Sequence, residues 1–276
     1  MGSSDVTASV ARRRPVVVHY HLFKNAGSSI DRALKDNFGA TWAERESNHR
    51  MPPADLAGFL LENPWVSAFS SHTATMPVPS VEGVDILPIV MLRHPVDRIR
   101  SVYEFERRQN VDGIGPNTAK GMTMEAFVAW RLDRFSQMRD RSFVNFQVER
   151  MALGGKEGTE LDRAMATIAG LPFVGVVEIF DQSLERLEGH IRELFPKVRL
   201  KAYRQNTSAP AKASLDERLG LFRDQIGVDL YDRLTDANED DMVLWNSARD
   251  RYQDPVEGDV AKAPTAAASP TSASGA

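Results

Sequence analysis

Residues 16–39 of the chain read VVVHYHLFKNAGSSIDRALKDNFG. The stretch begins with a short β-branched run, Val16 to Tyr20, of the kind that is buried in a parallel sheet. After a turn that contains glycine, apolar residues recur with helical spacing from residue 30 to residue 38, and Gly39 is a natural C-cap for that helix. Strand, turn and helix in this order open a β-α-β unit.

The rest of the chain continues the alternation of strands and helices. Further strands are predicted over residues 65–69, 86–92 and 173–177. After the first helix, others are predicted over residues 55–61, 96–108, 124–133, 161–169 and 181–194, and from Ser214 onward. The alternation predicts an α/β fold with a parallel central sheet flanked by helices, in which ligands bind beyond the carboxyl ends of the strands.

Composition limits the class of protein. The 276 residues are 42% hydrophobic and 26% charged and include no cysteine, which excludes disulfides, thiolate zinc sites and a cysteine nucleophile. Small polar residues dominate residues 1–13 and 253–276, so we expect disorder at both ends and one domain over residues 14–252. Because no apolar run is long enough for a membrane span or a signal peptide, we expect a cytoplasmic protein.

Charge is distributed unevenly along the chain. The net charge of −4 argues against a nucleic-acid partner that is held by phosphate contacts. Residues 1–153 nevertheless carry 19 Lys and Arg against 17 Asp and Glu, whereas residues 154–276 carry 15 against 21. The basic excess in the first part indicates a local anion site, although a run of charges is more often a solvated helix face.

The turn between the first strand and helix has the features of such an anion site. A helix N-terminus offers unpaired N–H groups, Gly27 permits close approach of the backbone, Ser28 and Ser29 add hydroxyls, and Lys24 adds a positive charge. The order differs from a Walker A loop, where the lysine follows the last glycine. The alternative is a tight strand-to-helix connection with a solvated lysine.

A second candidate anion site follows the apolar run 86–92. Arg93 stands at the carboxyl end of that strand, and Ser101 lies about two helical turns farther along the chain. Both side chains can then reach one bound phosphate. The alternative is that Arg93 pairs with a carboxylate while Arg98 and Arg100 coat the helix.

Together these segments resemble a known family. Residues 24–29 look like the 5′-phosphosulfate loop, and residues 92–103 like the 3′-phosphate segment, of sulfotransferases that use 3′-phosphoadenosine 5′-phosphosulfate (PAPS). The closer likeness is to the carbohydrate branch related to heparan sulfate 2-O-sulfotransferases, to which residues 145–155 and 174–184 are also similar. The resemblance covers most of residues 15–245 and implies a P-loop-like sulfotransferase fold.

The chain departs from the family pattern at three positions. Phe23 stands where the family has proline, Asn25 where it has threonine, and His94 where it has aspartate before Pro95. The last change removes a good helix cap, which leaves open how the helix over residues 96–108 begins.

The resemblance implies roles for individual residues. Lys24 and His72 are the expected catalytic residues, with His72 as general base because it follows the predicted strand 65–69 and titrates in a useful range. A histidine with a purely structural role in a loop is the alternative, and Glu44, Glu46 and His49 are reserve candidates for the base. PAPS is expected to bind, with no metal, through the following residues: Lys24, Asn25, Ala26, Gly27, Ser28, Ser29, Arg93, Ser101, Arg204 and Thr207.

The expected reaction is sulfuryl transfer from PAPS, which leaves as adenosine bisphosphate, to a hydroxyl of a carbohydrate, glycolipid or other small acceptor. The modest net charge favours a small or weakly charged acceptor over a long polyanion. Two other functions stay open: a P-loop nucleotide kinase or hydrolase that uses ATP and Mg²⁺, and a non-catalytic nucleotide- or glycan-binding protein. The sequence does not indicate an oligomeric state.

Overall fold

The computed structural model of the chain describes residues 13–138, 141–154, 156–203 and 213–253. The predicted disordered ends lie outside these ranges except for Arg13 and Gln253. The Arg13 guanidinium donates to the carbonyl oxygens of Val81 (3.0 Å) and Val84 (2.5 Å), so Arg13 belongs with the folded domain.

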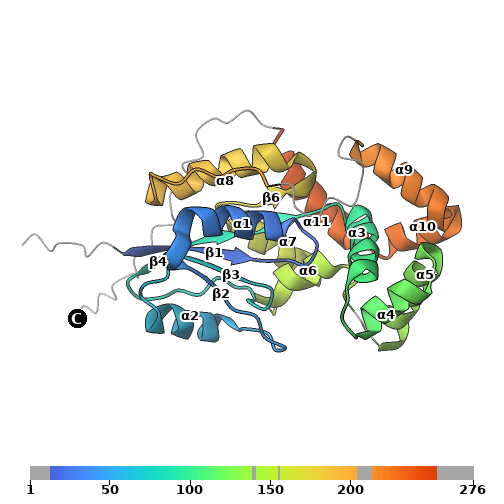
Figure 1. Cartoon of the computed structure of the whole chain (residues 1–276), viewed down its shortest axis with the longest axis horizontal. Coiled ribbons are helices and arrows are strands. Elements are labelled where there is room, and N and C mark those ends of the chain that lie inside the picture. The colour runs from blue at the N-terminus through green and yellow to red at the C-terminus, as the bar shows by residue number, and fades with distance from the viewer. Residues whose placement is uncertain (1–12, 139–140, 155, 204–212, 254–276) are drawn as a thin grey trace, which may run out of the picture.

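A parallel sheet forms the centre of the protein (Figure 1). Its four strands run in the order β2-β3-β1-β4 and are β1 (Arg14–Tyr20), β2 (Trp42–Glu44), β3 (Ala68–Ser71) and β4 (Val84–Ile89). Two short strands, β5 (Met91–Leu92) and β6 (Gly175–Val176), form a second parallel pair. The Gly175 N–H donates to the Val90 carbonyl oxygen (2.8 Å), so the second pair continues from the end of β4. The predicted parallel α/β architecture is confirmed.

The two faces of the sheet are covered by different helices because side chains alternate along each strand. Val17 packs on the face covered by α1 (Gly27–Phe38) and α8 (Phe180–Leu194). Val16 and Val18 belong to the core of the opposite face. The helices of that face are α2 (Pro53–Glu62), α6 (Phe146–Met151), α7 (Glu160–Gly170) and α11 (Glu239–Asp250).

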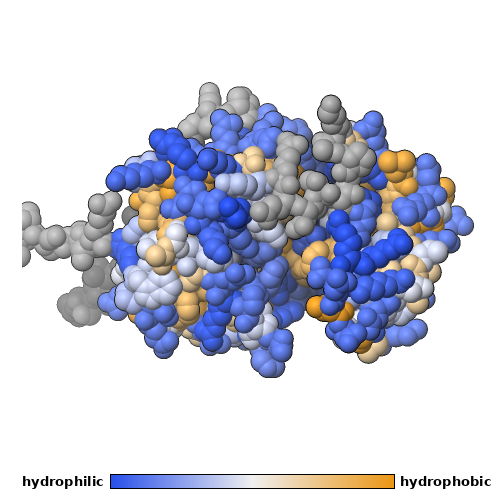
Figure 2. Space-filling view, in the orientation of Figure 1, coloured by the Kyte–Doolittle hydropathy of each residue, from blue (hydrophilic) through white to orange (hydrophobic). Residues whose placement is uncertain are grey.

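A helical lobe extends from one end of the sheet (Figure 1). It comprises α3 (Pro95–Arg108), α4 (Ile114–Gly121), α5 (Met124–Met138), α9 (Leu215–Ile226) and α10 (Val228–Asp236). Its core is a separate apolar cluster around Phe127, Phe143 and Phe222, which are almost completely buried. Most of the face drawn in Figure 2 is hydrophilic, and apolar side chains show in small groups both on the left and on the right, where this lobe lies.

The structure corrects several predicted elements. The predicted strand 86–92 is divided at Val90 into β4 and β5, and the strand predicted from residue 65 begins only at Ala68. The strand predicted over 173–177 is only two residues long and continues into a 3₁₀ turn, Val177–Ile179. The elements β2, α4 and α6 and the 3₁₀ turns Gly39–Thr41 and Ala152–Gly154 were not predicted. Within the described ranges, every helix is too short or too polar to cross a bilayer.

Candidate functional site

The predicted site residues are brought together by the parallel sheet. The carboxyl ends of parallel strands meet at one edge. The 21–26 turn follows β1, His72 follows β3, and Arg93 follows β5, so all three lie at this edge. Arg204 and Thr207, the other predicted PAPS contacts, lie outside the described residues.

The turn before α1 has an unusual backbone. Lys24 (φ 64°) and Ala26 (φ 60°) both adopt the left-handed conformation, which is uncommon for residues other than glycine and is found most often at functional sites. The helix starts at Gly27, and the Ser29 N–H already donates to the Ala26 carbonyl oxygen (3.0 Å), so the N–H groups of Gly27 and Ser28 are the ones without a partner within the helix. The Ser28 side chain is exposed beside them, whereas Ser29 is buried. These first-turn groups can therefore contact an anion.

Gly27 is needed for a reason that the sequence did not reveal. A Cβ atom at this position would lie 1.9 Å from the Cδ2 atom of the His21 ring and 2.0 Å from its Nε2 atom. The His21 imidazole therefore packs directly against the first residue of α1, in space that any other residue would occupy. The glycine was predicted to let a ligand approach, but in this structure it lets an imidazole approach.

The side chain of Asn25 points into the protein. Its Nδ2 donates to the Met91 carbonyl oxygen (2.8 Å) and to Gln147 Oε1 (2.7 Å), and its backbone N–H donates to the Leu22 carbonyl oxygen (3.2 Å). All of its donors are thus engaged within the protein. Asn25, predicted as a PAPS contact, shapes the turn in this structure and has no donor left to offer an anion.

Gln147 links the two predicted anion segments, a role that sequence analysis missed. Its Oε1 accepts from the Arg93 N–H (2.9 Å) as well as from Asn25, and its Nε2 donates to the Arg93 carbonyl oxygen (2.8 Å). The side chain is completely buried. The residue lies in one of the segments that resemble sulfotransferases, so the sequence marked its position but not its contacts. Gln147 therefore holds the turn before α1 and the end of β5 at a fixed separation.

His72 is oriented by the loop that follows β1. Its Nδ1 lies 2.8 Å from the His21 carbonyl oxygen. Because a carbonyl can only accept, Nδ1 carries the proton, and Nε2 of the neutral ring keeps a lone pair. Burial and the adjacent His21 ring lower the pKa of His72 below its ordinary value of 6.5. His72 is therefore a neutral, oriented base at neutral pH.

The backbone of His72 is fixed from two sides. Its N–H donates to Glu46 Oε1 (3.0 Å), and its carbonyl oxygen accepts from Arg150 Nη2 (2.6 Å). Of the reserve candidates for the base, Glu46 therefore holds the backbone of His72 in position. Glu44 and His49 are exposed.

Asp31 joins the two histidines of β1 and its following turn. It accepts from His19 Nδ1 (2.7 Å) and from His21 Nδ1 (2.8 Å), and the His21 ring contacts the His72 ring in a tilted arrangement, with centroids 3.6 Å apart and planes at 37°. Burial alone would raise the pKa of Asp31, but the two histidines hold it well below its usual range. The sequence did not single out Asp31.

The composition of this group is suitable for a metal ion, since His19, His21 and Asp31 each present one ligand atom within 4.8 Å of the others. The nitrogen-to-oxygen distances of 2.7 and 2.8 Å are, however, those of hydrogen bonds. Ligands of a tetrahedral zinc ion lie about 3.3 Å apart, given bond lengths of about 2.0–2.1 Å. The geometry is that of a carboxylate that orients two imidazoles.

Lys24 lies on the ring of Phe105, a residue of α3. Its Nζ is 4.3 Å from the ring centroid. Burial, and then the nearby guanidinium groups of Arg93 and Arg108, lower the pKa of Lys24 to about 8. The ammonium group is thus charged at neutral pH and only partly compensated, which favours an anion beside it.

Arg93 is paired with a carboxylate in this structure, as the alternative reading of the sequence had it, but Arg98 and Arg100 are buried and do not coat the helix. Its Nε (3.0 Å) and Nη2 (2.6 Å) donate to Asp97 Oδ2, and its Nη1 donates to the Lys24 carbonyl oxygen (3.0 Å). Asp97 is buried and also accepts from Arg100 and Arg218. Ser101, the predicted partner of Arg93 at a phosphate, is buried one turn beyond Asp97 on α3.

Helix α3 begins at Pro95 without the usual side-chain cap. The N-cap residue His94 makes no capping hydrogen bond with its side chain. Instead its N–H donates to Glu178 Oε1 (3.0 Å), and its ring packs edge-on against Trp245 at 4.9 Å. Glu178 Oε2 also accepts from Trp245 Nε1 (2.9 Å). Packing between distant segments thus replaces the missing cap.

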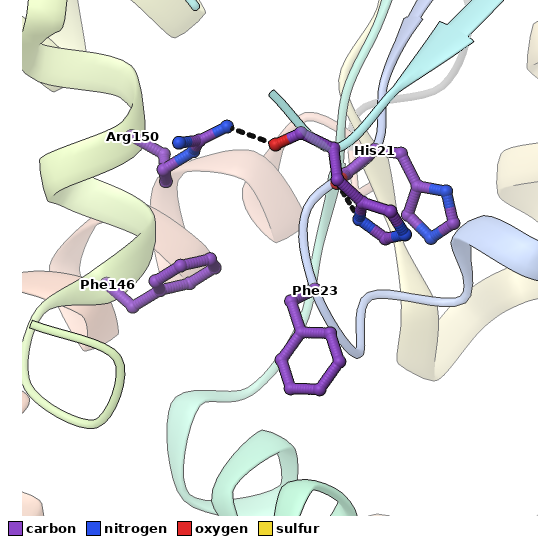
Figure 3. Close-up of a pocket in the computed structure, with 5 residues that line it drawn as sticks. His21, Phe23, Phe146 and Arg150 are labelled. Carbon is purple, nitrogen blue, oxygen red and sulfur yellow. Dashed lines mark hydrogen bonds between the residues drawn. The ribbon is translucent and has the colours of Figure 1, made fainter. Parts of the chain in front are cut away.

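A cleft of about 300 Å³ opens beside these groups (Figure 3). It is lined by His21, Phe23, His72, Phe146 and Arg150. In the view of Figure 3, the rings of Phe146, from α6, and of Phe23, from the turn after β1, lie below His21. The cleft therefore contains the oriented base and the residue that stands where the resembled family has proline.

Comparison with known proteins gives a relative but no function. No family model matches the chain. It is 34% identical over 253 residues to a protein of Archaeoglobus fulgidus, and the match covers 87% of this chain and 98% of that protein. The chain belongs to the family of this archaeal protein. The relative is described only as an uncharacterized protein, so membership of its family assigns no activity.

Proposed function

We propose that the protein is a sulfotransferase that moves a sulfuryl group from PAPS to the hydroxyl of a small acceptor. The observation that carries the proposal is the hydrogen bond from His72 Nδ1 to the His21 carbonyl oxygen (2.8 Å). It fixes a neutral base to the same turn that offers a lysine and a helix N-terminus to an anion. A base and an anion site held together in this way suit the transfer of an anionic group to a hydroxyl.

The turn between β1 and α1 is suited to the 5′-phosphosulfate of the donor. The first-turn N–H groups at Gly27 and Ser28 and the exposed Ser28 hydroxyl would contact phosphate oxygens. Lys24 would neutralise charge on the sulfuryl group and on the leaving phosphate. The lowered pKa of Lys24, about 8, supports this role because a half-buried, partly compensated charge gains from an anionic partner.

Arg93 and Ser101 would hold the 3′-phosphate, which distinguishes PAPS from ATP. A phosphate at Arg93 would compete with Asp97 for the guanidinium group. Arg100 and Arg218 would then keep Asp97 paired, since both already donate to it. Arg204 and Thr207 remain expected contacts on the strength of the resemblance alone.

The transfer step uses His72 as the base. As the acceptor oxygen forms its bond to sulfur, the acceptor proton passes to His72 Nε2. The bond between sulfur and the 5′-phosphate oxygen breaks, and its electron pair leaves with 3′,5′-adenosine bisphosphate. Proton transfer to a positioned base contributes about 10²- to 10⁴-fold to such a rate. A cytoplasmic location is part of this proposal.

Two measurements test the proposal. Adenosine bisphosphate should raise the thermal unfolding temperature more than ATP with Mg²⁺ does, and labelled sulfate should pass from PAPS to a panel of hydroxylated acceptors. His72→Ala should reduce turnover about 10²-fold or more and leave the affinity for adenosine bisphosphate unchanged. Stabilisation by ATP with Mg²⁺ alone would favour a nucleotide kinase or hydrolase. Full turnover in the His72→Ala variant would rule out the assigned base.

A further inference from the structure

The walls of the cleft beside His72 are mostly aromatic. Of the five lining side chains, Phe23 and Phe146 are phenyl rings, and His21 and His72 are imidazoles in contact with each other. Only Arg150 has no ring. The volume of about 300 Å³ is at the lower end of the range, about 300–1,000 Å³, of small-molecule sites. The cleft therefore suits a compact ligand with flat faces.

Both phenyl rings are supported from behind by α3. Phe23 packs edge-on against Phe105, with ring centroids 5.4 Å apart and planes at 78°. The guanidinium carbon of the buried Arg98 lies 4.4 Å from the centroid of the Phe146 ring. Supported rings lose little conformational freedom when a ligand stacks on them, so they form a preorganised aromatic surface.

The lining offers few polar groups to a ligand. His21 Nδ1 is bound to Asp31, His72 Nδ1 to a carbonyl oxygen, and Arg150 Nη2 to the carbonyl oxygens of His72 and Ala74. A monosaccharide carries several hydroxyls, and each one buried without a partner costs about 1–3 kcal/mol. Among the described lining residues, His72 Nε2 is the clearest acceptor for the hydroxyl that reacts, and Arg150 Nε and Nη1 are further donors. These are too few partners for the several hydroxyls of a saccharide, which disfavours that class of acceptor.

We propose that the acceptor is an aromatic alcohol of the phenol class, with its ring against Phe23 and Phe146 and its hydroxyl at His72 Nε2. This inference rests on the proposed sulfuryl transfer and replaces the expected saccharide with a flatter, more apolar acceptor. A phenol loses its proton near pH 10, as tyrosine does, so an imidazole is an adequate base for it. The product is an aryl sulfate, and His72 takes the phenolic proton.

The test compares two acceptors with the full-length protein and PAPS: 2-naphthol and methyl β-D-glucopyranoside. We expect kcat/KM for 2-naphthol to exceed that for the glucoside by about 100-fold or more, which corresponds to two unpaired hydroxyls. Phe146→Ala should raise the KM for 2-naphthol about tenfold or more and leave the affinity for adenosine bisphosphate unchanged. Phe135→Ala, which removes a half-buried ring of α5 that does not line the cleft, is the control and should change neither value.

The outcomes separate this inference from the proposed function. Sulfation of the glucoside at an equal or higher kcat/KM would overturn the aromatic acceptor and leave the sulfotransferase in place. Binding of adenosine bisphosphate without any sulfation of 2-naphthol would also overturn it. If Phe146→Ala does not fold, Phe23→Leu tests the same wall, and an unchanged KM in a folded variant would count against the inference. A failure to bind adenosine bisphosphate would instead reject the proposed function.

Discussion

The two segments predicted to bind phosphate differ in how their charges are used. In the segment 24–29, the Lys24 ammonium lies against an aromatic ring and has a lowered pKa, and the N–H groups of Gly27 and Ser28 have no partner within α1. In the segment that begins at Arg93, the guanidinium group is bound to Asp97 and to the Lys24 carbonyl oxygen. The first segment is open to an anion, whereas the second is occupied by a carboxylate of the protein itself.

This difference shows that the type of a residue does not by itself indicate whether its charge is available to a ligand. Lysine and arginine gave equal reason to expect a phosphate, but in the structure the Lys24 charge is only partly compensated, whereas the Arg93 charge is in a salt bridge. A ligand gains the full interaction at Lys24, whereas at Arg93 it gains only the excess over Asp97. We therefore expect the first segment to dominate catalysis and the second to tune recognition.

The largest expected effect is that of Lys24→Ala. The variant should lose about 10³-fold or more in turnover with PAPS, because one preorganised charge at a developing anion is worth about 10²- to 10³-fold and Lys24 also binds the donor. Thermal stability should hold, since the substitution removes a charge whose burial is unfavourable. Lys197→Ala, at an exposed position, is the control. Turnover within tenfold of the wild type would contradict the central role of the open segment.

Arg93→Ala should have the next largest effect, and it should be selective. We expect the affinity for 3′,5′-adenosine bisphosphate to fall about 10- to 100-fold, the value of a charge-assisted hydrogen bond, and the affinity for adenosine 5′-phosphate to change little. Arg100→Ala is a matched control because Arg100 also donates to Asp97 and should cost similar stability. Calorimetric titration gives both affinities. Equal losses for the two nucleotides would show that Arg93 acts only through Asp97.

A smaller effect is expected when the link between the two segments is removed. Gln147→Leu leaves the Arg93 N–H and one donor of Asn25 without a buried partner. The free energy of unfolding should fall by about 1–3 kcal/mol, and the affinity for adenosine bisphosphate should fall less than tenfold. Chemical denaturation measures the first quantity, with Gln137→Leu on the exposed surface of α5 as control. An affinity loss larger than that of Arg93→Ala would mean that the segments act as one unit.

The sequence predicted most of the fold because the strongest signals in it are local. The β-branched run of β1, the helical spacing of α1 and the stop at Gly39 each lie within a few residues. The short strand β2 was missed because its three residues form a strand only by pairing with β3. Val90 divides a uniformly apolar run because Gly175, far along the chain, bonds to its carbonyl oxygen. Contacts between residues far apart in the chain therefore determine these two features, which the local sequence pattern does not encode.

The residues of the site could be predicted from the sequence, but the hydrogen bonds and ion pairs between them could not. The position of His72 after an apolar run identified it as a candidate base, and the structure adds the carbonyl that fixes its tautomer. Asp31 lies on the predicted first helix and has no mark in the sequence that separates it from Asp36. Its role follows only from the two histidines that the β1 turn brings to it. Likewise, nothing local distinguishes an Arg93 bound to Asp97 from a free one.

The last effect we predict is a pH dependence that belongs to the segment 24–29 alone. The pKa of Lys24 is lowered to about 8 in the free protein, so its charge is present at pH 7 and is lost as the pH rises through about 8. A bound anion favours the charged form, and binding above pH 8 must therefore take up a proton. The affinity for adenosine bisphosphate should fall about tenfold from pH 7 to pH 9, the limit set by the charged fraction at each pH.

Titration calorimetry in two buffers of different ionisation enthalpy measures the proton uptake directly. Arg93→Ala should keep this dependence, since arginine stays charged throughout, and Lys24→Ala should abolish it. A pH dependence that survives Lys24→Ala would assign the titrating group elsewhere and remove the distinction between the two segments.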